Sequence, residues 1–342
     1  MAGMGAAPAG ASARGAVSAT ALVTGARGFA GAWLSAALLE RGDRVVCFDR
    51  TPLPDGRPSA LALLGVEGDV DEFEGDLRDA EAVDAAFADH RPDAVFHLAA
   101  QVLVGTAAAS PEPTFDTNVR GTWLLLEACR RHEVARTVVA SSDKAYGAHD
   151  ELPYREDFAL RPTAPYEASK SAADVIARSY WPAYGVPVAV TRFANLYGGA
   201  DTNWSRLVPE AVTAALDGRS PVLRSDGSPE RDFLYVEDAA QAYLVLADAL
   251  DREEIRGEAF NAGGGEPHAV EEVVELIARL AGTGVEPDIQ GTGNPEGEID
   301  RQWVDPAKLR ERTGWSPKVG LEEGLGRTIE WYRERPEVRP PG

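Results

Sequence analysis

Short apolar runs alternate with longer amphipathic stretches over roughly the first 195 residues of the chain. The runs carry few polar positions, which is typical of strands buried on both faces of a parallel sheet. We expect strands at 21–24, 44–49, 94–101, 136–140 and 188–195. The stretches between them are expected to be helices at 32–41, 80–90, 113–132 and 166–184. Alternating strands and helices predict an α/β fold with a doubly wound parallel sheet.

A glycine-rich turn joins the first expected strand to the first expected helix, and its glycines are Gly25, Gly28 and Gly31. Such a turn brings backbone N–H groups and a helix N-terminus against a pyrophosphate. The second strand ends in Asp49, close to the spacing of the acid that binds an adenosine ribose. The pattern predicts a Rossmann domain that binds a dinucleotide. An acid at this place favours NAD over NADP, whereas the next residue, Arg50, weakens that preference.

The pattern is less regular after residue 195. Strands are expected at 233–236 and 258–262, and helices at 238–250, 270–280 and 321–333. We predict an NAD-binding Rossmann domain over 19–194 and 232–257, and a smaller C-terminal α/β substrate-binding domain over 195–231 and 258–334. The Ala- and Gly-rich residues 1–18 are expected to be a disordered tail, and the Pro-rich residues 335–342 a frayed end.

The composition of the chain limits the kinds of molecule that it is expected to bind. A net charge of −21 over 342 residues argues against nucleic acid or an anionic membrane, and no apolar run is long enough to span a bilayer. Cys47 and Cys129 lie in apolar surroundings, which indicates a reducing, cytoplasmic compartment. No cluster of Cys and His has metal-ligand spacing, so no metal is expected, and His97 is interpreted as structural.

Three polar side chains, Ser142, Asp143 and Lys144, follow the strand expected at 136–140. Ligands of open α/β sheets bind at the carboxyl ends of the strands. A hydroxyl, an acid and an amine at such a place suffice for proton transfer at a bound substrate. The alternative is a turn that uses Ser and Asp only to bond its own backbone.

Tyr166 and Lys170 are spaced i and i+4 on the helix expected at 166–184, so they share one helix face. An ammonium group beside a phenol favours the ionised phenol, which would make Tyr166 a general base for a sugar or alcohol hydroxyl. Only four of the 34 basic residues are lysine, and Lys144 and Lys170 lie in the segments with candidate chemistry. Arginine cannot replace a compact, titratable amine. A surface Tyr/Lys pair is the alternative.

In so acidic a chain, an anionic ligand must be met by local positive charge. The candidates to neutralise a substrate pyrophosphate are Arg206, Arg224, Arg231 and Arg301. Of these, Arg231 is favoured, and each of the others is equally well explained as a solvated side chain.

Several segments, in this order and spacing, resemble the extended short-chain dehydrogenase/reductase family, specifically its nucleotide-sugar 4,6-dehydratases and epimerases. The resemblance covers about residues 19–334 and is carried by Thr24 to Gly31, His97 to Gln101, Asn118, Ser141 to Gly147, Tyr166 with Lys170, Asn195, and Arg231 to Asp238. The segment Ser142-Asp143-Lys144 resembles the corresponding segment of the CDP-glucose 4,6-dehydratases. The 4-epimerases usually have small residues in place of Asp143 and Lys144, and the dTDP-glucose dehydratases have Thr-Asp-Glu in this segment. Gly105-Thr106 replaces a basic pair of the CDP-glucose type, and 224–238 is more similar to the dTDP and GDP relatives.

The resemblance implies a homodimer that binds NAD and a nucleoside-diphosphate sugar, with the helices around 114–132 and 166–184 forming a four-helix bundle. The residues implied to bind NAD are Gly25, Gly28, Phe29, Ala30, Gly31, Asp49, Arg50, Asp76, Leu77, Leu98, Ala99, Ala100, Asn118, Tyr166 and Lys170. Those implied to bind the nucleotide sugar are Gln101, Asn195, Arg206, Leu207, Arg224, Arg231 and Arg301. The implied catalytic residues are Ser142, Asp143, Lys144, Tyr166 and Lys170.

The implied reaction converts a hexose into its 4-keto-6-deoxy form. Tyr166, with Lys170 lowering its pKa and Ser142 sharing the hydrogen bond, deprotonates the 4-hydroxyl as hydride passes from C4 to NAD. The 4-ketone acidifies the C5 proton, Asp143 protonates the departing 6-hydroxyl, and hydride returns to C6. Lys144 stands where relatives have Glu; a free lysine is protonated at neutral pH. We therefore favour an electrostatic role for Lys144 over a base, and both roles stay open.

Two other functions are compatible with the same residues. One is a nucleotide-sugar epimerase of the same family, and the other is a non-catalytic NAD-binding regulatory protein. Ser142, Asp143, Tyr166 and Lys170 together argue against the second.

Overall fold

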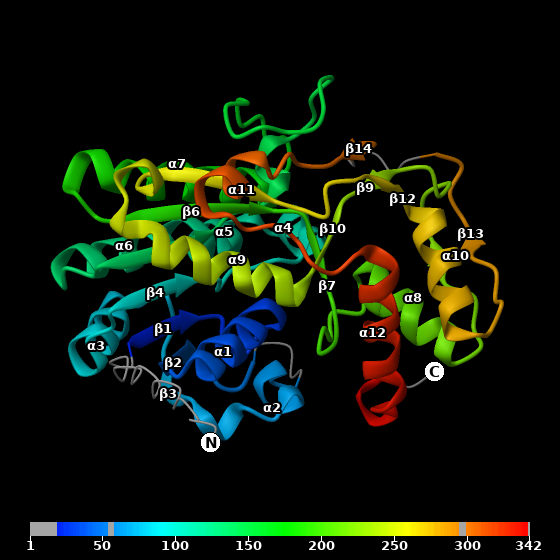
Figure 1. Cartoon of the computed structure of the whole chain (residues 1–342), viewed down its shortest axis with the longest axis horizontal. Coiled ribbons are helices and arrows are strands. Elements are labelled where there is room, and N and C mark those ends of the chain that lie inside the picture. Colours follow the sequence, from blue (N-terminus) through cyan, green and yellow to red (C-terminus); the bar gives the residue numbers. More distant parts are fainter. Residues whose placement is uncertain (1–18, 54–57, 294–298, 341–342) are drawn as a thin grey trace, which may run out of the picture.

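The computed structural model describes residues 19–53, 58–293 and 299–340. Within these ranges, seven strands form the central sheet in the order β11-β6-β5-β4-β1-β2-β3 (Figure 1). They are β1 (Thr20–Thr24), β2 (Arg44–Asp49), β3 (Asp71–Glu74), β4 (Ala94–His97), β5 (Arg136–Ala140), β6 (Val188–Phe193) and β11 (Glu258–Ala262). All neighbouring strands are parallel. The strand order reverses direction between β1 and β4, which confirms the doubly wound sheet and places a ligand crevice at that point.

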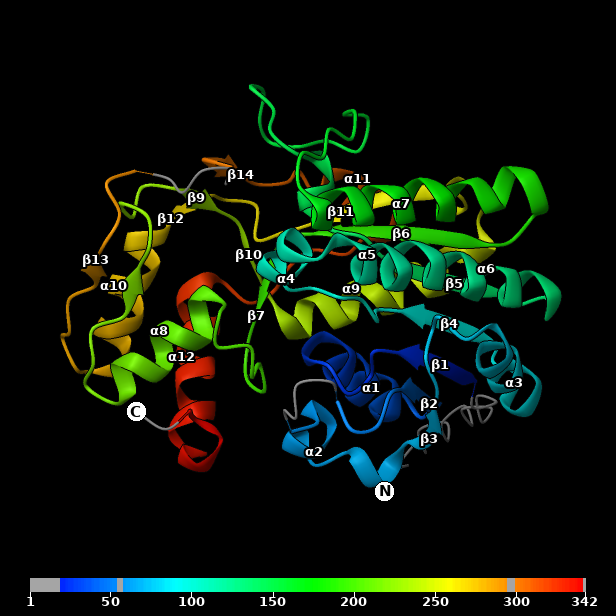
Figure 2. The same ribbon diagram turned by 180° about the vertical axis from the view of Figure 1, so that it is seen from behind.

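Helices cover both faces of the sheet, and each face has its own core (Figures 1 and 2). One face carries α1 (Phe29–Arg41), α2 (Ala60–Leu64) and α9 (Val236–Asp248), which bury Leu38 and Leu246 against the sheet. The other carries α3 (Ala80–His90), α6 (Gly121–Arg131) and α7 (Pro165–Tyr184), which bury Phe87 and Leu126. Each such side chain stabilises the fold by about 1.5–3 kcal/mol relative to its exposed state.

The helix expected at 113–132 contains a π-helical turn. α5 (Pro111–Phe115) is joined to α6 by a π-helical turn over Asp116–Arg120, and α4 (Val104–Ala109) precedes both. The expected helix is therefore confirmed over 113–131, but its π turn was not predicted, because an apolar period does not register the extra residue of such a turn. The wider turn carries Asn118, which is buried and bonded to neighbouring segments.

A second, smaller unit lies beside the sheet (Figure 1, right). Its helices are α8 (Leu207–Leu216), α10 (Val270–Ala281) and α12 (Leu321–Arg333), and they bury Val212, Ile277 and Ile329 in a common core. Its short strands are β7 (Asn195–Tyr197), β8 (Val222–Leu223), β9 (Glu230–Arg231), β10 (Phe233–Tyr235), β12 (His268–Ala269), β13 (Asp288–Ile289) and β14 (Arg301–Gln302). The remaining helix, α11 (Ala307–Thr313), packs against β11.

Two strands of the central sheet differ from the sequence-based division. β3 was not expected, because its residues Asp-Glu-Phe-Glu lack an apolar run and sit at the exposed edge of the sheet. β11 had been grouped with the substrate-binding domain, but it pairs with β6 over all five of its residues and so completes the central sheet. No helix in the described part of the chain combines the length and apolar character that crossing a bilayer requires.

Candidate active site

The glycine-rich turn after β1 is packed tightly against the end of β4. Gly25 has φ 75°, and a Cβ on it would lie 2.7 Å from the main-chain nitrogen of Ala99. A Cβ on Gly31 would collide with the carbonyl oxygen of Gly25. Glycine at both positions therefore lets α1, capped by Gly28, begin directly beside β1 and β4. The resulting backbone cradle at a helix N-terminus fits the pyrophosphate of a dinucleotide.

A pocket of about 180 Å³ at the end of β2 is lined by three carboxyl groups, those of Asp49, Glu72 and Glu74. Asp49 accepts a hydrogen bond of 2.8 Å from the main-chain nitrogen of Arg27, and burial raises its pKa to about 6. The Arg27 guanidinium is held by Glu72 and by Glu67, so its charge is already neutralised. Three acids disfavour the 2′-phosphate of NADP, and the pocket therefore fits NAD.

Arg50 is drawn away from this pocket. Its guanidinium lies 3.8 Å from a carboxylate oxygen of Asp76, and the same carboxylate is bonded by Arg78. Hydrogen bonding to Arg78 is the main reason why the pKa of Asp76 is lowered. The next residue, Leu77, packs against Gly121 of α6. Asp76 and Leu77 thus lie at the same end of the sheet as Asp49. Their contact with a cofactor stays a prediction.

Asn118 and Gln101 bind each other. The Asn118 side chain accepts from the main-chain nitrogen of Gln101 (2.7 Å) and donates to its carbonyl oxygen (3.0 Å) and to Ser169 Oγ (2.9 Å). The Gln101 side chain turns back to Leu103 and Thr114. In the structure Asn118 therefore fastens the loop after β4 to α7. Contact of Asn118 with NAD, and of Gln101 with substrate, stays a prediction.

Tyr166 and Lys170 begin α7 and are both buried. The Lys170 ammonium donates to the carbonyl oxygen of Ala140, at the end of β5 (2.9 Å), and burial lowers its pKa to about 8. Burial raises the pKa of Tyr166 to about 12, and the charge that opposes this rise comes from Arg206, not from Lys170. The cation that favours ionised Tyr166 is thus supplied by the smaller unit, which the helical spacing of Tyr166 and Lys170 did not indicate.

The segment after β5 forms a 3-10 turn over Asp143–Tyr146. Ser142 precedes it; its hydroxyl donates to Asp143 Oδ1 (3.0 Å) and accepts from the main-chain nitrogen of Lys144 (3.2 Å). The side chain of Asp143 is buried, and within the described ranges its Oδ2 has no hydrogen-bond partner. Burial raises the pKa of Asp143, and the charge of Lys144 opposes this. Asp143 and Ser142 both act on the pKa of Tyr166, so these side chains share one site.

Three of the four predicted pyrophosphate-binding arginines lie at two places, Arg206 at the start of α8 and Arg231 and Arg301 on paired strands. Arg206 caps α8, pairs with Asp201 at 2.9 Å and lies 5.9 Å from the ring centre of Phe29. Arg231 on β9 is close enough to lower the pKa of Asp143. Arg301 lies on the neighbouring β14 and bonds to Glu230.

Two other predicted substrate-binding residues, Asn195 and Leu207, lie beside these arginines. Asn195 donates to the carbonyl oxygen of Asp232, beside Arg231, and Leu207 follows Arg206 at the start of α8. Arg224 follows β8 and is exposed. Sugar binding by these residues stays a prediction.

Sequence reasoning missed a buried ion pair behind the site. Arg192 on β6 and Asp174 on α7 are both almost fully buried and are joined at 2.8 and 2.9 Å. Two signals could have found it. An arginine stands within an apolar strand, where only a paired charge is tolerated, and Asp174 continues the i, i+4 series of Tyr166 and Lys170.

His97 is structural, as expected: its two ring nitrogens bond to the hydroxyls of Thr24 and Thr122 at 2.8 and 2.9 Å. Burial, with a smaller contribution from the charge of Lys170, lowers its pKa to about 3. Within the described ranges, no three His, Cys, Asp or Glu side chains are grouped as metal ligands would be.

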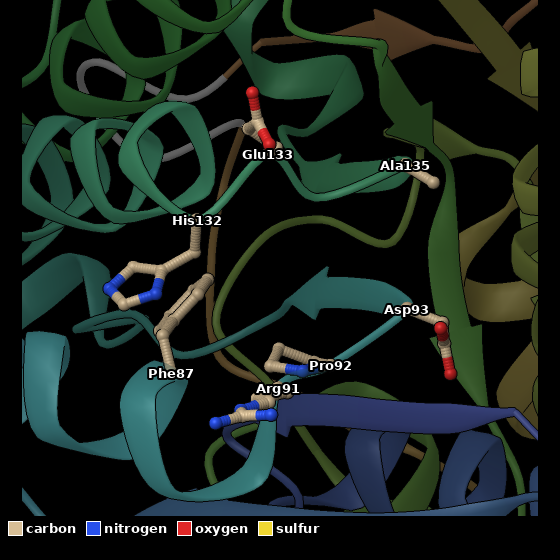
Figure 3. A pocket seen from close by; sticks show the side chains of 7 residues that line it. All are labelled: Phe87, Arg91, Pro92, Asp93, His132, Glu133 and Ala135. Carbon is tan, nitrogen blue, oxygen red and sulfur yellow. The ribbon is translucent and has the colours of Figure 1, made fainter.

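A larger pocket, of about 340 Å³, lies at the opposite ends of the strands (Figure 3). Asp93 and Ala135, which line it, immediately precede β4 and β5. Its other side chains include His132, which pairs with Asp84 at 3.0 Å, and Phe87, whose ring lies beside His132. Ligands of open α/β sheets bind at the carboxyl ends of the strands, so this pocket is not the candidate active site.

Comparison with known proteins agrees with this geometry. The model of the GDP-mannose 4,6-dehydratase family matches residues 22–328. A dTDP-glucose 4,6-dehydratase of Streptomyces antibioticus is 34% identical over 92% of this chain and 92% of its own. The structure of a dTDP-glucose 4,6-dehydratase from Bacillus anthracis in complex with NAD is similar with a TM-score of 0.82, at 29% identity, over 94% of this chain and 98% of that one.

An epimerase structure is similar to about the same degree. The UDP-glucose 4-epimerase of Thermus thermophilus in complex with NAD has a TM-score of 0.79 and 33% identity, over 92% of this chain and 99% of that one. The NAD in both neighbours, the glycine cradle and the acidic pocket together identify NAD as the cofactor. The fold is shared by both reactions, so the choice between them rests on individual side chains.

Proposed function

Because this chain belongs to the nucleotide-sugar 4,6-dehydratase family, we propose that it converts a nucleoside-diphosphate hexose into its 4-keto-6-deoxy sugar. The observation that carries the proposal is Asp143, a buried carboxyl group with a raised pKa beside Ser142 and Tyr166. A carboxyl group with a raised pKa keeps its proton to higher pH than an exposed one, and in its acid form it can protonate a departing hydroxyl. A C4 epimerase has no leaving group to protonate and does not need this acid.

When bound, NAD supplies a hydride acceptor for C4 of the hexose and later a hydride donor for C6. Tyr166 removes the proton of the 4-hydroxyl, with Ser142 sharing that hydrogen bond. The ketone at C4 then acidifies the C5 proton, which passes to solvent. Asp143 donates its proton to the 6-hydroxyl, which leaves as water, and the Asp143 carboxylate regains a proton from solvent. Two electrons leave C4 and two return to C6, while C5 regains a proton, so the net change is the loss of one water.

Lys144 supplies positive charge beside Asp143. We propose that this charge stabilises the enolate that forms when C5 loses its proton. Lys144→Met is expected to slow water loss by about 10²-fold while NAD binding is kept. Lys144→Glu is expected to keep NAD binding but to change the elimination step. Water loss at the wild-type rate in Lys144→Met would show that Lys144 is neither a base nor an electrostatic group.

The nucleotide is the least constrained part of the substrate. Ser142-Asp143-Lys144 favours CDP-glucose, whereas the relatives at 33–34% identity are named for dTDP-glucose. The protein should be incubated with NAD and the CDP-, GDP-, dTDP- and UDP-hexoses, and mass spectrometry used to detect loss of water. One nucleotide is expected to be dehydrated fastest, with deuterium from heavy water incorporated at C5.

The same experiment tests the two alternatives. Inversion at C4 with the 6-hydroxyl retained would identify an epimerase, whose fold this chain shares. Tight NAD binding without turnover of any of the four nucleotides would identify a regulatory protein. The buried thiols of Cys47 and Cys129 support action in a reducing compartment such as the cytoplasm, and the net charge of −21 argues against a nucleic-acid partner.

We propose that two copies associate through α6 and α7. Trp123 on α6 and Val175 and Tyr184 on α7 are large apolar side chains that are 42%, 58% and 60% exposed. Two such helix pairs would form a four-helix bundle. Trp123→Glu is expected to convert the dimer into a monomer in sedimentation equilibrium. Ile289→Glu is the control, because Ile289 is equally exposed but lies on β13. A wild-type protein that sediments as a monomer would refute the proposal.

A further inference from the structure

A set of buried polar contacts lies directly behind the catalytic turn. Tyr146, the last residue of the turn, donates from its hydroxyl to Asn261 Oδ1 (2.8 Å) and accepts from Arg192 (3.0 Å). Arg192 is held by Asp174. All four side chains are almost fully buried. The far end of the turn that carries Asp143 is therefore fastened to β6, β11 and α7.

Tyr154 closes this set from the long loop between the turn and α7. Its hydroxyl donates to the carbonyl oxygen of Gly147 at 2.6 Å, and its carbonyl oxygen accepts from Asn261 Nδ2 at 2.9 Å. Its ring lies 4.8 Å from that of Tyr146. Gly147 ends the turn with a positive φ of 68°, which favours glycine. Tyr154 thus holds the C-terminal end of the catalytic turn through its hydroxyl, which binds Gly147, and through its carbonyl oxygen, which binds Asn261.

The backbone of Tyr154 also belongs to a second connection. Its nitrogen donates to the carbonyl oxygen of Trp303 and its carbonyl oxygen accepts from the nitrogen of Asp305, both at 2.9 Å. Residues 301–305 continue from β14, which pairs with β9 so that Gln302 lies opposite Arg231. The loop around Tyr154 rises on the same side of the molecule as β14 (Figures 1 and 2). One residue therefore links the strands that carry the predicted pyrophosphate-binding arginines to the catalytic turn.

Asp232 strengthens the same connection. Its carboxylate accepts from the nitrogen of Gly264 at 2.7 Å and from the nitrogen of Val304 at 3.5 Å. Val304 packs with Tyr146 and Tyr154 in a small buried cluster. Asp143 and Asp232 are near enough for the charge of one to raise the pKa of the other. Segment 301–305 is consequently fixed on one side to β9 and on the other to the turn.

We propose that Tyr154 is a positioning residue, which couples segment 301–305 to the catalytic turn and so holds Asp143 where it protonates the departing 6-hydroxyl. The inference rests on the proposed dehydratase function. Tyr154 acts mainly on the elimination step, because it fastens the turn at Gly147. By contrast, Ser142 lies at the opposite end of the turn, next to β5, and Tyr166 and Lys170 are held by α7. A purely structural residue would instead affect C4 oxidation and water loss to the same extent.

Tyr154→Phe tests this, because it keeps the ring against Tyr146 and removes only the hydrogen bond to Gly147. Misplacement of a catalytic group by about 1 Å can cost 10²-fold, so we expect water loss to slow by about 10- to 10²-fold while C4 oxidation stays near the wild-type rate. Oxidation would then outrun elimination, and the near-ultraviolet absorbance of enzyme-bound NADH would accumulate. Tyr146→Phe, which removes the hydrogen bonds from the end of the turn to Asn261 and Arg192, is expected to show the same selectivity.

Tyr197→Phe is the matched control. Tyr197 is also a buried tyrosine whose hydroxyl donates to a main-chain carbonyl, that of Leu321, but it lies on β7 away from the turn. Thermal unfolding should change similarly in Tyr154→Phe and Tyr197→Phe, and only the former should accumulate NADH. Equal slowing of both steps, or no accumulation, in Tyr154→Phe would overturn the inference. A wild-type protein that dehydrates no nucleotide hexose would overturn the proposed function, and this inference with it.

Discussion

Replacement of Tyr166 with phenylalanine is expected to lower the rate of C4 oxidation by about 10²–10⁴-fold, the usual contribution of a positioned general base. The fold should be kept, because only the phenolic oxygen is lost from a buried ring. Rapid mixing of the NAD-loaded enzyme with its nucleotide hexose, followed by NADH absorbance, measures this step. Tyr243→Phe is the control: Tyr243 is a buried tyrosine close to Tyr166, and its hydroxyl accepts a hydrogen bond of 3.4 Å from Thr191.

The pH dependence of this step follows from the charges around Tyr166. With a pKa of about 12 the phenol is protonated at neutral pH, so the oxidation rate should rise with pH as the ionised fraction increases. Arg206 lowers this pKa, and Arg206→Gln should therefore move the rise to higher pH. A rate that is independent of pH in wild type and equal in Tyr166→Phe would show that Tyr166 is not the base.

Asp143→Asn is expected to leave C4 oxidation nearly intact and to slow water loss by about 10²–10⁴-fold. Asparagine has the same shape but carries no transferable proton. The variant should therefore accumulate NADH and the 4-keto hexose, which mass spectrometry can distinguish from the dehydrated product. Asp143→Asn separates elimination from oxidation, whereas Tyr166→Phe stops the reaction before either product forms.

The protonation state of Asp143 sets the sign of its pH effect. Burial raises its pKa, so more of the acid form persists toward neutral pH than for an exposed aspartate, although Lys144, Ser142 and Arg231 oppose this. Since the acid form is the active one, water loss in wild type should fall as pH rises through this pKa. In Asp143→Asn the fall should disappear. An unchanged pH profile in the variant would contradict the role of Asp143 as proton donor.

Much of the central sheet was predictable because its strands are buried on both faces and read as apolar runs. β3 and the π turn at Asn118 were not predictable, since an acidic edge strand and one extra helical residue leave no periodic signal. The cofactor was predictable because local geometry restricts the residue type at each position that indicated it. Gly25 has a positive φ, Gly31 packs against the backbone of Gly25, and Asp49 ends β2, where an acid is typical of NAD-binding sheets.

The sequence alone predicts the class of chemistry, through Ser142, Asp143, Tyr166 and Lys170, which lie at the ends of predicted elements. Only the tertiary structure decided how these groups are tuned. Arg206 and not Lys170 lowers the pKa of Tyr166, and Tyr154 joins the catalytic turn to segment 301–305. Tyr166 and Arg206, like Tyr154 and Trp303, are tens of positions or more apart in the sequence. Side-chain burial and charge proximity depend on how the two units pack together, and no local spacing encodes that distance.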